Sequence, residues 1–209
     1  MIEIIKGKIK INKKFLSSFN RLPFDKYLKY HQQNYRLRRF SKFKIRNQKI
    51  FFEKETFFLQ KATNNRFLGG INRKYAPLEN SCLKYFSEII KKNFNFIIYK
   101  KNLEIGLHQI RIICGEDFVG YPVPEGWHRD GFDYIAIINF GSKNIEGGIS
   151  RIRSSITQNS DNYSGFLAAG EYLFFNDRKF YHYADPINVF KKKKNGFRDT
   201  LVITFKILK

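Results

Sequence analysis

Apolar and polar residues alternate in two stretches of the N-terminal half. The first twelve or so residues (MIEIIKGKIKIN) and residues 41–60 (SKFKIRNQKIFFEKETFFLQ) both show a period of two. Since successive side chains of a strand point to opposite faces, the first stretch predicts a strand and the second a hairpin. Residues 23–39 (PFDKYLKYHQQNYRLRR) are basic and aromatic, and we expect a helix with a trailing loop there.

Residues 79–93 (ENSCLKYFSEIIKKN) have the spacing of an amphipathic helix. Lysines occupy the remaining faces, and Asn80 or Ser81 could cap the N-terminus. The predicted apolar face consists of Leu83, Phe86, Ile89 and Ile90.

The chain changes character from about residue 95, where short β-rich runs begin. The runs are FNFIIYK, LHQIRII, DYIAIINF, GISRIRS, EYLFF and TLVITFKIL. Gly, Pro, Asn and Asp separate them, a pattern typical of a barrel or a double-sheet jelly roll. We therefore expect one mainly β domain over residues 1–209, with flanking helices. A helical and strand extension would reach to about residue 94, and the jelly-roll core would occupy about residues 95–209.

Composition supports a folded core and gives no sign of a membrane span. Hydrophobic residues make up 43% of the 209 residues and aromatic residues 17%, which suffices for a sizeable core. No apolar run approaches the ~18 residues of a membrane helix, and the first residues lack the continuous apolar stretch of a signal peptide. Cys82 and Cys114 are more typical of two reduced thiols than of a disulfide, so we expect a cytoplasmic protein.

The formal net charge is +21, from 39 Lys and Arg against 18 Asp and Glu. Such an excess can indicate nucleic acid, an anionic membrane surface or an acidic partner. The excess is rich in Lys and accompanied by many Asn, Ile, Phe and Tyr, as an AT-rich genome would produce. We favour this compositional explanation, and nucleic acid remains a possible but not a favoured partner.

A candidate metal site is the strongest chemical signal. His128 and Asp130 stand two residues apart in PEGWHRDGFDYIAIINF, so on an extended segment their side chains point the same way. His182, in FFNDRKFYHYADPI, can join them from another strand. Two imidazoles and one carboxylate leave coordination positions open, as in non-haem Fe(II) oxygenases. A structural zinc site would favour cysteines, and neither cysteine lies near. Surface or hydrogen-bonded histidines are the plainer alternative.

Arg198 begins the strand-like run RDTLVITF and shares its predicted face with Thr200. An arginine among apolar neighbours is costly to bury unless an anion pairs with it. The carboxylate of a cosubstrate such as 2-oxoglutarate is a natural bidentate partner, and the Thr200 hydroxyl could add a hydrogen bond. A structural salt bridge to Asp185 or Asp177 is the alternative.

Substrate residues are harder to identify. Gln109 and Arg111 share one face of a predicted strand, opposite His108 and Ile110. If that face points inward, Arg111 could pair with a substrate carboxylate. A structural arginine is the alternative, and we interpret His108 as a hydrogen-bonded histidine of the sheet. Asp177, shortly before His182, could support that imidazole.

Together these motifs resemble the bacterial 2-oxoglutarate/Fe(II) dioxygenases that include L-isoleucine 4-hydroxylase. The resemblance rests on GYPVPEGWHRDGFDYIAIINFGSKNIEGGISRI, FNDRKFYHYADPI and GFRDTLVITF, and upstream on YRLRRFSKF, FLQKATNNRFLGGINRKYAPLE and LHQIRI. It implies a double-stranded β-helix, a cupin-like jelly roll, with His128, Asp130 and His182 as iron ligands. Arg198 would bind the distal carboxylate of 2-oxoglutarate. The implied cofactors are Fe(II), 2-oxoglutarate and O2, with ascorbate as a stimulant.

Three functions are compatible with these features. The resemblance implies hydroxylation of an aliphatic carbon of a free L-amino acid. The charge and YRLRRFSKF favour a macromolecular or carrier-bound substrate, protein or nucleic acid. A non-catalytic jelly-roll binding protein is the third, and the complete set of His128, Asp130, His182 and Arg198 argues against it. The substrate, the carbon oxidised, its stereochemistry, hydroxylation or desaturation, and the oligomeric state stay open.

Overall fold

The structure is a computed structural model that describes residues 3–28, 34–54, 57–60, 62, 69–99 and 102–208. In chain order, its elements are β1 (Ile4–Lys8), η1 (Lys13–Arg21), β2 (Arg36–Arg46), β3 (Lys49–Phe52), β4 (Phe57–Phe58), β5 (Arg73–Lys74), α1 (Asn80–Asn93), α2 (Asn95–Ile98), β6 (Leu103–Cys114), β7 (Tyr134–Lys143), β8 (Ile145–Gly147), β9 (Ser150–Arg153), β10 (Tyr163–Gly165), β11 (Glu171–Asn176), β12 (Tyr181–Ala184), β13 (Ile187–Val189) and β14 (Gly196–Ile207).

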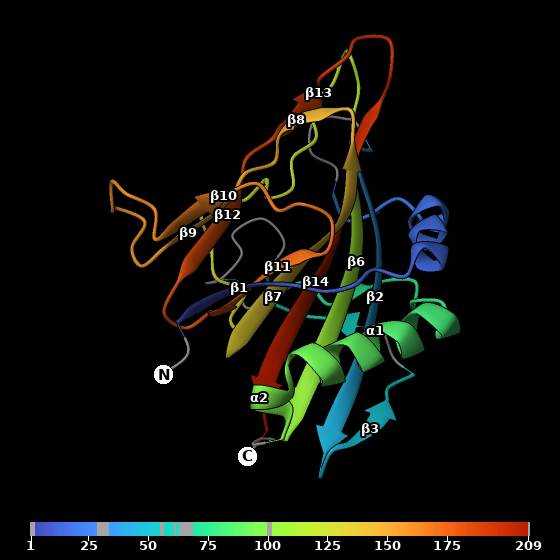
Figure 1. The fold of residues 1–209 in the computed structure, drawn as a ribbon, viewed down its shortest axis with the longest axis vertical. Helices are drawn as coiled ribbons and strands as arrows, with labels where there is room; N and C mark the ends of the chain where they lie inside the picture. The colour runs from blue at the N-terminus through green and yellow to red at the C-terminus, as the bar shows by residue number, and fades with distance from the viewer. Residues whose placement is uncertain are drawn as a thin grey trace.

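A large antiparallel sheet forms the body of the protein (Figure 1). Its strand order is β1-β11-β7-β14-β6-β2-β3, and smaller sheets are formed by β10-β9-β12, β13-β8 and β4-β5. Strand β14 pairs along its whole length with β6, and on its other side from Phe197 to Phe205 with β7. The protein is thus mainly β, with the double-stranded β-helix predicted from the sequence.

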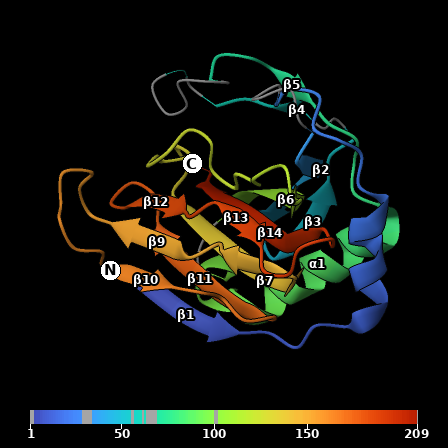
Figure 2. The ribbon, with the colours of Figure 1, turned by 90° about the horizontal axis from the view of Figure 1, so that it is seen from above.

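Helices cover one face of the large sheet. Figure 2 shows α1 on one side of it and the β4–β5 hairpin on the other. The helix places Phe86 and Ile90 in the core against Ile203 and Phe205 of β14. The helix predicted over residues 79–93 is therefore confirmed. Its N-cap residue is Glu79, not Asn80 or Ser81, and the Glu79 carboxylate makes no capping bond but accepts from Arg21.

The opposite face of the large sheet carries polar residues that line a cavity. Along β14, the period of two sends Leu201 and Ile203 into the helix-covered core and Thr200 and Val202 into a cavity on the other side. The register of β14 against β7 shifts between Asp199 and Thr200. Strand β2 alternates in the same way, so that Arg36 and Arg38 lie on the cavity side.

Two local predictions are wrong. The described residues of 23–39 do not form a helix: β2 begins at Arg36, and the preceding helical element, η1, already ends at Arg21. Residues 29–33 lie outside the described residues. Backbone pairing with β6 from Arg36 to Ile45 outweighs the helical composition. The run FNFIIYK is not a strand, because residues 95–98 continue the helical region as α2.

Other predictions from the N-terminal half hold. Strand β1 lies within the first alternating stretch, and β2 and β3 form a hairpin whose turn places Asn47 and Gln48 at positive φ. Cys82 and Cys114 are buried free thiols. Among the described residues, none of the helices combines the length and the apolar character that a membrane crossing requires. The boundary near residue 94 stays a prediction, and the large sheet takes strands from both sides of it.

Candidate metal centre and its cavity

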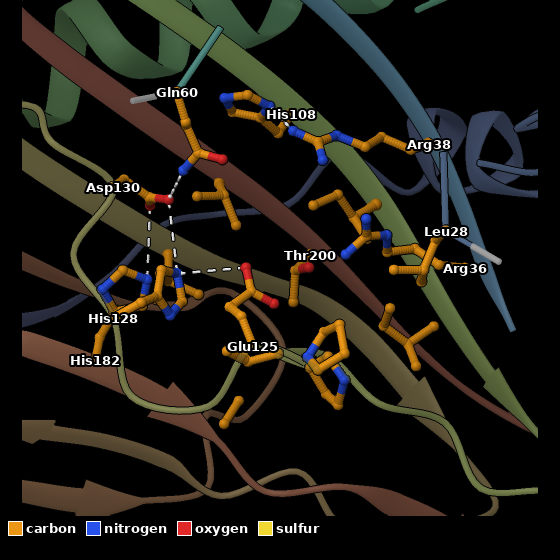
Figure 3. A pocket seen from close by; sticks show the side chains of 18 of the residues that line it. Leu28, Arg36, Arg38, Gln60, His108, Glu125, His128, Asp130, His182 and Thr200 are labelled. Atoms are coloured by element: carbon orange, nitrogen blue, oxygen red, sulfur yellow. Dashed lines mark hydrogen bonds and ion pairs between the residues drawn. The ribbon is translucent and has the colours of Figure 1, made fainter. Parts of the chain in front are cut away.

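His128, Asp130 and His182 converge at one end of a cavity (Figure 3). His128 and His182 form an isolated β-bridge, with reciprocal backbone hydrogen bonds of 3.2 and 3.0 Å. The Asp130 carboxylate lies 3.6 Å from Nε2 of each imidazole. One donor atom from each of the three side chains lies within 4.8 Å of the other two, so they could hold a metal ion.

The backbone around Asp130 is fixed by a buried carboxylate, that of Asp177. Its oxygens accept the N–H groups of Asp130, Gly131 and Phe132 at 3.1, 2.7 and 2.9 Å. Gly131 has φ +87°, a conformation that L side chains rarely adopt, which lets the chain turn directly after Asp130. Asp177 therefore orients the segment that presents the carboxylate, and its Oδ1 is also 3.9 Å from Nδ1 of His182.

The ring of His128 is oriented by its own loop. Its Nδ1 lies 3.0 Å from the carbonyl oxygen of Gly126, so a hydrogen is assigned to Nδ1, and Nε2 on the Asp130 side is the atom that could bind a metal. An imidazole held in this way by a carbonyl is a common arrangement for metal-binding histidines.

Burial and mutual interaction shift the pKa values of His128, Asp130 and His182 away from their ordinary values. Burial lowers the pKa of His182 to about 3, assisted by the charge of His128. Burial alone would also lower the pKa of His128, but the Asp130 carboxylate raises it to about 9. Burial would raise the pKa of Asp130, and the two imidazoles instead lower it below its ordinary value. One buried carboxylate thus interacts with two imidazoles. These three side chains form a donor set that suits a divalent cation.

Arg198 lies farther along the same cavity, on β14. Its side chain is buried, NH2 donates to Ser150 Oγ at 3.0 Å, and Nε has no partner in the described part of the chain. Burial lowers the pKa of this guanidinium to about 10. Gly148 lies beside Arg198 at φ +66°, where a Cβ would be in ordinary contact with Arg198 Cδ at 3.6 Å but tight against Ile187 Cγ2 at 3.1 Å. Thr200 also lines this part of the cavity.

The alternative salt bridges predicted for Arg198 are not formed. Asp185 pairs with Arg151 at 2.8 Å, and Asp177 is occupied by backbone N–H groups. A buried guanidinium with an unpartnered donor fits the carboxylate of 2-oxoglutarate well.

The cavity has a volume of about 300 Å³, and its walls include several polar residues that the sequence did not reveal. These are Arg36, Arg38, Gln60, Arg73, His108 and Glu125. The available signal was the alternation of arginines with Leu37 in YRLRRF, which as a strand places Arg36 and Arg38 on one face. Because the chain has 39 Lys and Arg residues, these arginines did not stand out in the sequence.

Gln109 and Arg111 lie on the other face of β6. Gln109 donates to Ser18 of η1 at 2.7 Å, and Arg111 forms a bidentate pair with Asp199 at 2.6 and 2.7 Å. Their suggested role required that this face point inward, and that condition is not met. His108, their neighbour on the opposite face, lines the cavity instead.

Gln60 connects the candidate metal centre to the β4–β5 hairpin. Its amide nitrogen donates to Asp130 Oδ1 at 2.6 Å, and its oxygen accepts from Arg73 NH2 at 2.7 Å. The amide is held from both sides, so it restrains the orientation of the carboxylate.

A jelly roll that presents two imidazoles and a carboxylate to a common centre defines the class of mononuclear non-haem iron oxygenases. The family model described as 2OG-Fe dioxygenase matches residues 16–204, and the chain belongs to this family. The family implies an oxygenase that depends on Fe(II), 2-oxoglutarate and O2, as the sequence predicted.

Several solved structures share the fold of this chain. A bsmA homolog from Methylobium petroleophilum PM1 is 25% identical, with a TM-score of 0.80 over 93% of this chain and 80% of that one. IDO from Bacillus thuringiensis is 18% identical, with a TM-score of 0.78 over 99% and 91%. The Fe(II)/(alpha)ketoglutarate-dependent dioxygenase TqaL is 14% identical, with a TM-score of 0.61 over 99% and 84%. No curated protein matches the chain in sequence.

Proposed function

We propose that this dioxygenase oxidises an aliphatic C–H bond of a free L-amino acid, as do the bacterial enzymes that include L-isoleucine 4-hydroxylase. His128, Asp130 and His182 would hold Fe(II), and Arg198 with Thr200 would bind 2-oxoglutarate. The observation that carries the proposal is the position of these five side chains on one small cavity of about 300 Å³. Metal, cosubstrate and substrate would therefore meet away from bulk water.

The iron, when bound, supplies the oxidative decarboxylation of 2-oxoglutarate and the attack on an unactivated C–H bond. The side chains contribute binding and orientation. Arg198 and Ser150 would fix the distal carboxylate, so that the opposite end of 2-oxoglutarate points towards His128 and His182. Ile137 and Val202, which also line the cavity, would exclude water.

The cavity supports a small substrate that carries charge. Its volume is at the lower end of the roughly 300–1,000 Å³ range for small-molecule sites. Its walls combine arginines with Glu125 and with apolar residues such as Phe58 and Val123. A zwitterion with an aliphatic side chain matches this mixture of positive, negative and apolar surface.

The charge of +21 favours a second candidate, a macromolecular or carrier-bound substrate. Against it, Arg36, Arg38 and Arg73 are buried within the cavity walls and do not form an exposed track leading to the centre. Recognition of a nucleic-acid backbone would need clustered exposed cations.

A succinate-release screen tests the proposal. The protein is incubated with Fe(II), 2-oxoglutarate, O2 and ascorbate, and each proteinogenic L-amino acid is added in turn. We expect one or a few aliphatic amino acids to stimulate succinate release and to gain one oxygen atom by mass spectrometry. If none stimulates while substrate-independent succinate release persists, the amino-acid substrate is wrong and the macromolecular candidate replaces it.

A further inference from the structure

Three buried guanidinium groups line the cavity without a carboxylate partner among the described residues. These are Arg38, Arg73 and Arg198, and the first two lie apart from the proposed 2-oxoglutarate site. Arg36, on the same wall, is different because it pairs with the buried Asp25 at 2.9 Å. Burying an unpaired charge is strongly unfavourable. Two cations therefore remain that neither the fold nor the cosubstrate neutralises.

Both side chains are held in place by neutral groups. Arg38 donates to His108 Nδ1 and to the Tyr75 hydroxyl, the latter at 3.4 Å, and its Nε has no partner in the described chain. Arg73 is 1% exposed, and its Nε is also without a partner there. The Phe58 ring lies 5.3 Å from the Arg38 guanidinium carbon and 4.8 Å from that of Arg73. The aromatic contacts position the two cations on one wall.

Asp25 interacts with the charge of Arg38, but its carboxylate is already paired with Arg36. Burial lowers the pKa of Arg73, and the charges of Arg38 and Arg36 lower it further. Burial and the charge of Arg38 also lower the pKa of His108 well below its ordinary value, so its ring is neutral. The potential on this wall is therefore positive, and an anion would relieve the repulsion between the two guanidiniums.

The side chain of Gln60 connects this wall to the candidate metal centre. Gln60 accepts from Arg73 and donates to Asp130, so Arg73 is one residue away from the triad. A small molecule held at Arg73 would thus extend only a few atoms before reaching the metal. Figure 3 shows Arg38 and His108 on the far side of Gln60 from His128 and His182.

We propose that Arg38 and Arg73 form a second anion subsite, which binds the carboxylate of the substrate and points its aliphatic part at the metal. This rests on the proposed function and names the specificity-determining residues of the same site. Guanidinium groups bind planar carboxylates in preference to amides, because a carboxylate accepts from both groups and neutralises their charge. Arg198 would serve the cosubstrate, and Arg38 with Arg73 the substrate.

The test compares two probes of equal shape, isovalerate and isovaleramide. Each is titrated calorimetrically into the protein saturated with Mn(II) and 2-oxoglutarate, so that the Arg198 subsite is filled and no turnover occurs. We expect isovalerate to bind at least about 10-fold more tightly than the amide. Equal affinities, or no binding of isovalerate, would overturn the proposal. This comparison uses the unaltered protein and does not depend on the fate of any variant.

Variants then assign the effect to the two arginines. Arg38→Gln combined with Arg73→Gln should abolish the preference for the acid and raise the KM of any stimulating amino acid by at least about 30-fold. Because Arg73 also donates to Gln60, the variant and the unaltered protein are compared at saturating metal, so that a change in metal affinity is not read as a change in the subsite. Arg39→Gln, on the opposite face of β2, and Lys74→Gln, beside Arg73, are the matched controls. A double variant that still prefers isovalerate would refute the assignment.

The two proposals can fail separately. If no amino acid stimulates turnover but isovalerate binding depends on Arg38 and Arg73, the subsite stands and the substrate is another carboxylate. If amino acids stimulate turnover and their carboxamides do so equally well, the function stands and the subsite is wrong.

Discussion

The two walls of the cavity present different charged groups to its interior. On the wall formed by β12, β14 and the 126–132 loop, one carboxylate, Asp130, faces two imidazoles, which suits a divalent cation. On the wall formed by β2 and the β4–β5 hairpin, Arg38 and Arg73 both contact the Phe58 ring and have no carboxylate partner among the described residues. The triad on the first wall therefore suits a cation, whereas Arg38 and Arg73 on the second suit an anion.

The difference suggests a division of labour. The residues that would carry the chemistry all lie between 128 and 200, on the 126–132 loop, β12 and β14. The residues that would select the substrate, Arg38 and Arg73, lie on β2 and β5. Gln60 joins the two walls through its bonds to Asp130 and Arg73.

The largest effect is expected from Asp130→Ala, which removes the only carboxylate of the triad. Two imidazoles alone should bind Fe(II) weakly, and 2-oxoglutarate turnover should fall by more than about 100-fold, beyond the cost of losing a supporting contact. Succinate release is the measurement. The exposed Asp117→Ala should behave like the unaltered protein. Turnover within about 10-fold of normal would remove Asp130 from the metal centre.

The next largest effect is expected from Asp25→Asn, which removes the carboxylate that pairs with Arg36 on the second wall. Arg36 would lose its buried partner, and we expect the free energy of unfolding at neutral pH to fall by about 3 kcal/mol. Denaturant unfolding measures this, with the exposed Asp117→Asn as control. A loss below about 0.5 kcal/mol would mean that the buried pair contributes little.

The same variant has a defined pH dependence. Burial would raise the pKa of Asp25, but the charges of Arg36 and Arg38 hold it below its ordinary value. A depressed folded-state pKa contributes stability above the unfolded value, and this is lost as the pH falls through the folded value. The stability difference between the protein and Asp25→Asn should therefore be full at pH 6 and shrink below about pH 4. A difference that grows on acidification would contradict the pair.

Arg198→Gln should affect the first wall more moderately. Loss of one partner of a buried charge pair costs about 2 kcal/mol or more, so the KM for 2-oxoglutarate should rise roughly 30-fold. The affinity for Mn(II) in the absence of 2-oxoglutarate should stay unchanged, which separates this role from metal binding. Arg46→Gln, at an exposed hairpin end, is the control. An unaltered KM would exclude Arg198 from the cosubstrate site.

The smallest effect is expected from Gln60→Ala, which cuts the link between the walls. Asp130 would keep its backbone support from Asp177 but lose the amide donor. Loss of such a supporting hydrogen bond typically weakens metal binding by about 10-fold or more. Titration with Mn(II) measures it, with the exposed Asn188→Ala as control. Unchanged Mn(II) affinity would show that Asp177 alone positions the carboxylate.

The sequence predicted the first wall far better than the second. His128, Asp130, His182 and Arg198 are specific as a combination of motifs, although none of them is specific alone. Arg38 and Arg73 are two among many basic residues, and only the pairing of β2 with β6 and the fold of the hairpin bring them together. Gln60 carries no signal at all before its neighbours are known.

Secondary structure shows the same contrast. The long runs that became β6, β7 and β14 have a clear period of two and were predicted correctly. Residues 23–39 mislead because their composition suits a helix, whereas the pairing of β2 with β6 is a long-range interaction that no local pattern reports. Arg111 was misread for a related reason, since alternation gives two faces but not which one is inside.

Strand β1 has a practical consequence. It pairs with β11 from Ile4 to Lys8, at the margin of the large sheet. A version of the protein that starts after Lys8 would expose the backbone of β11, whose sequence from Tyr172 to Phe175 is entirely apolar. Unpaired N–H and C=O groups on such a strand recruit strands of other molecules. Shortening the N-terminus would therefore promote aggregation while leaving every cavity residue in place.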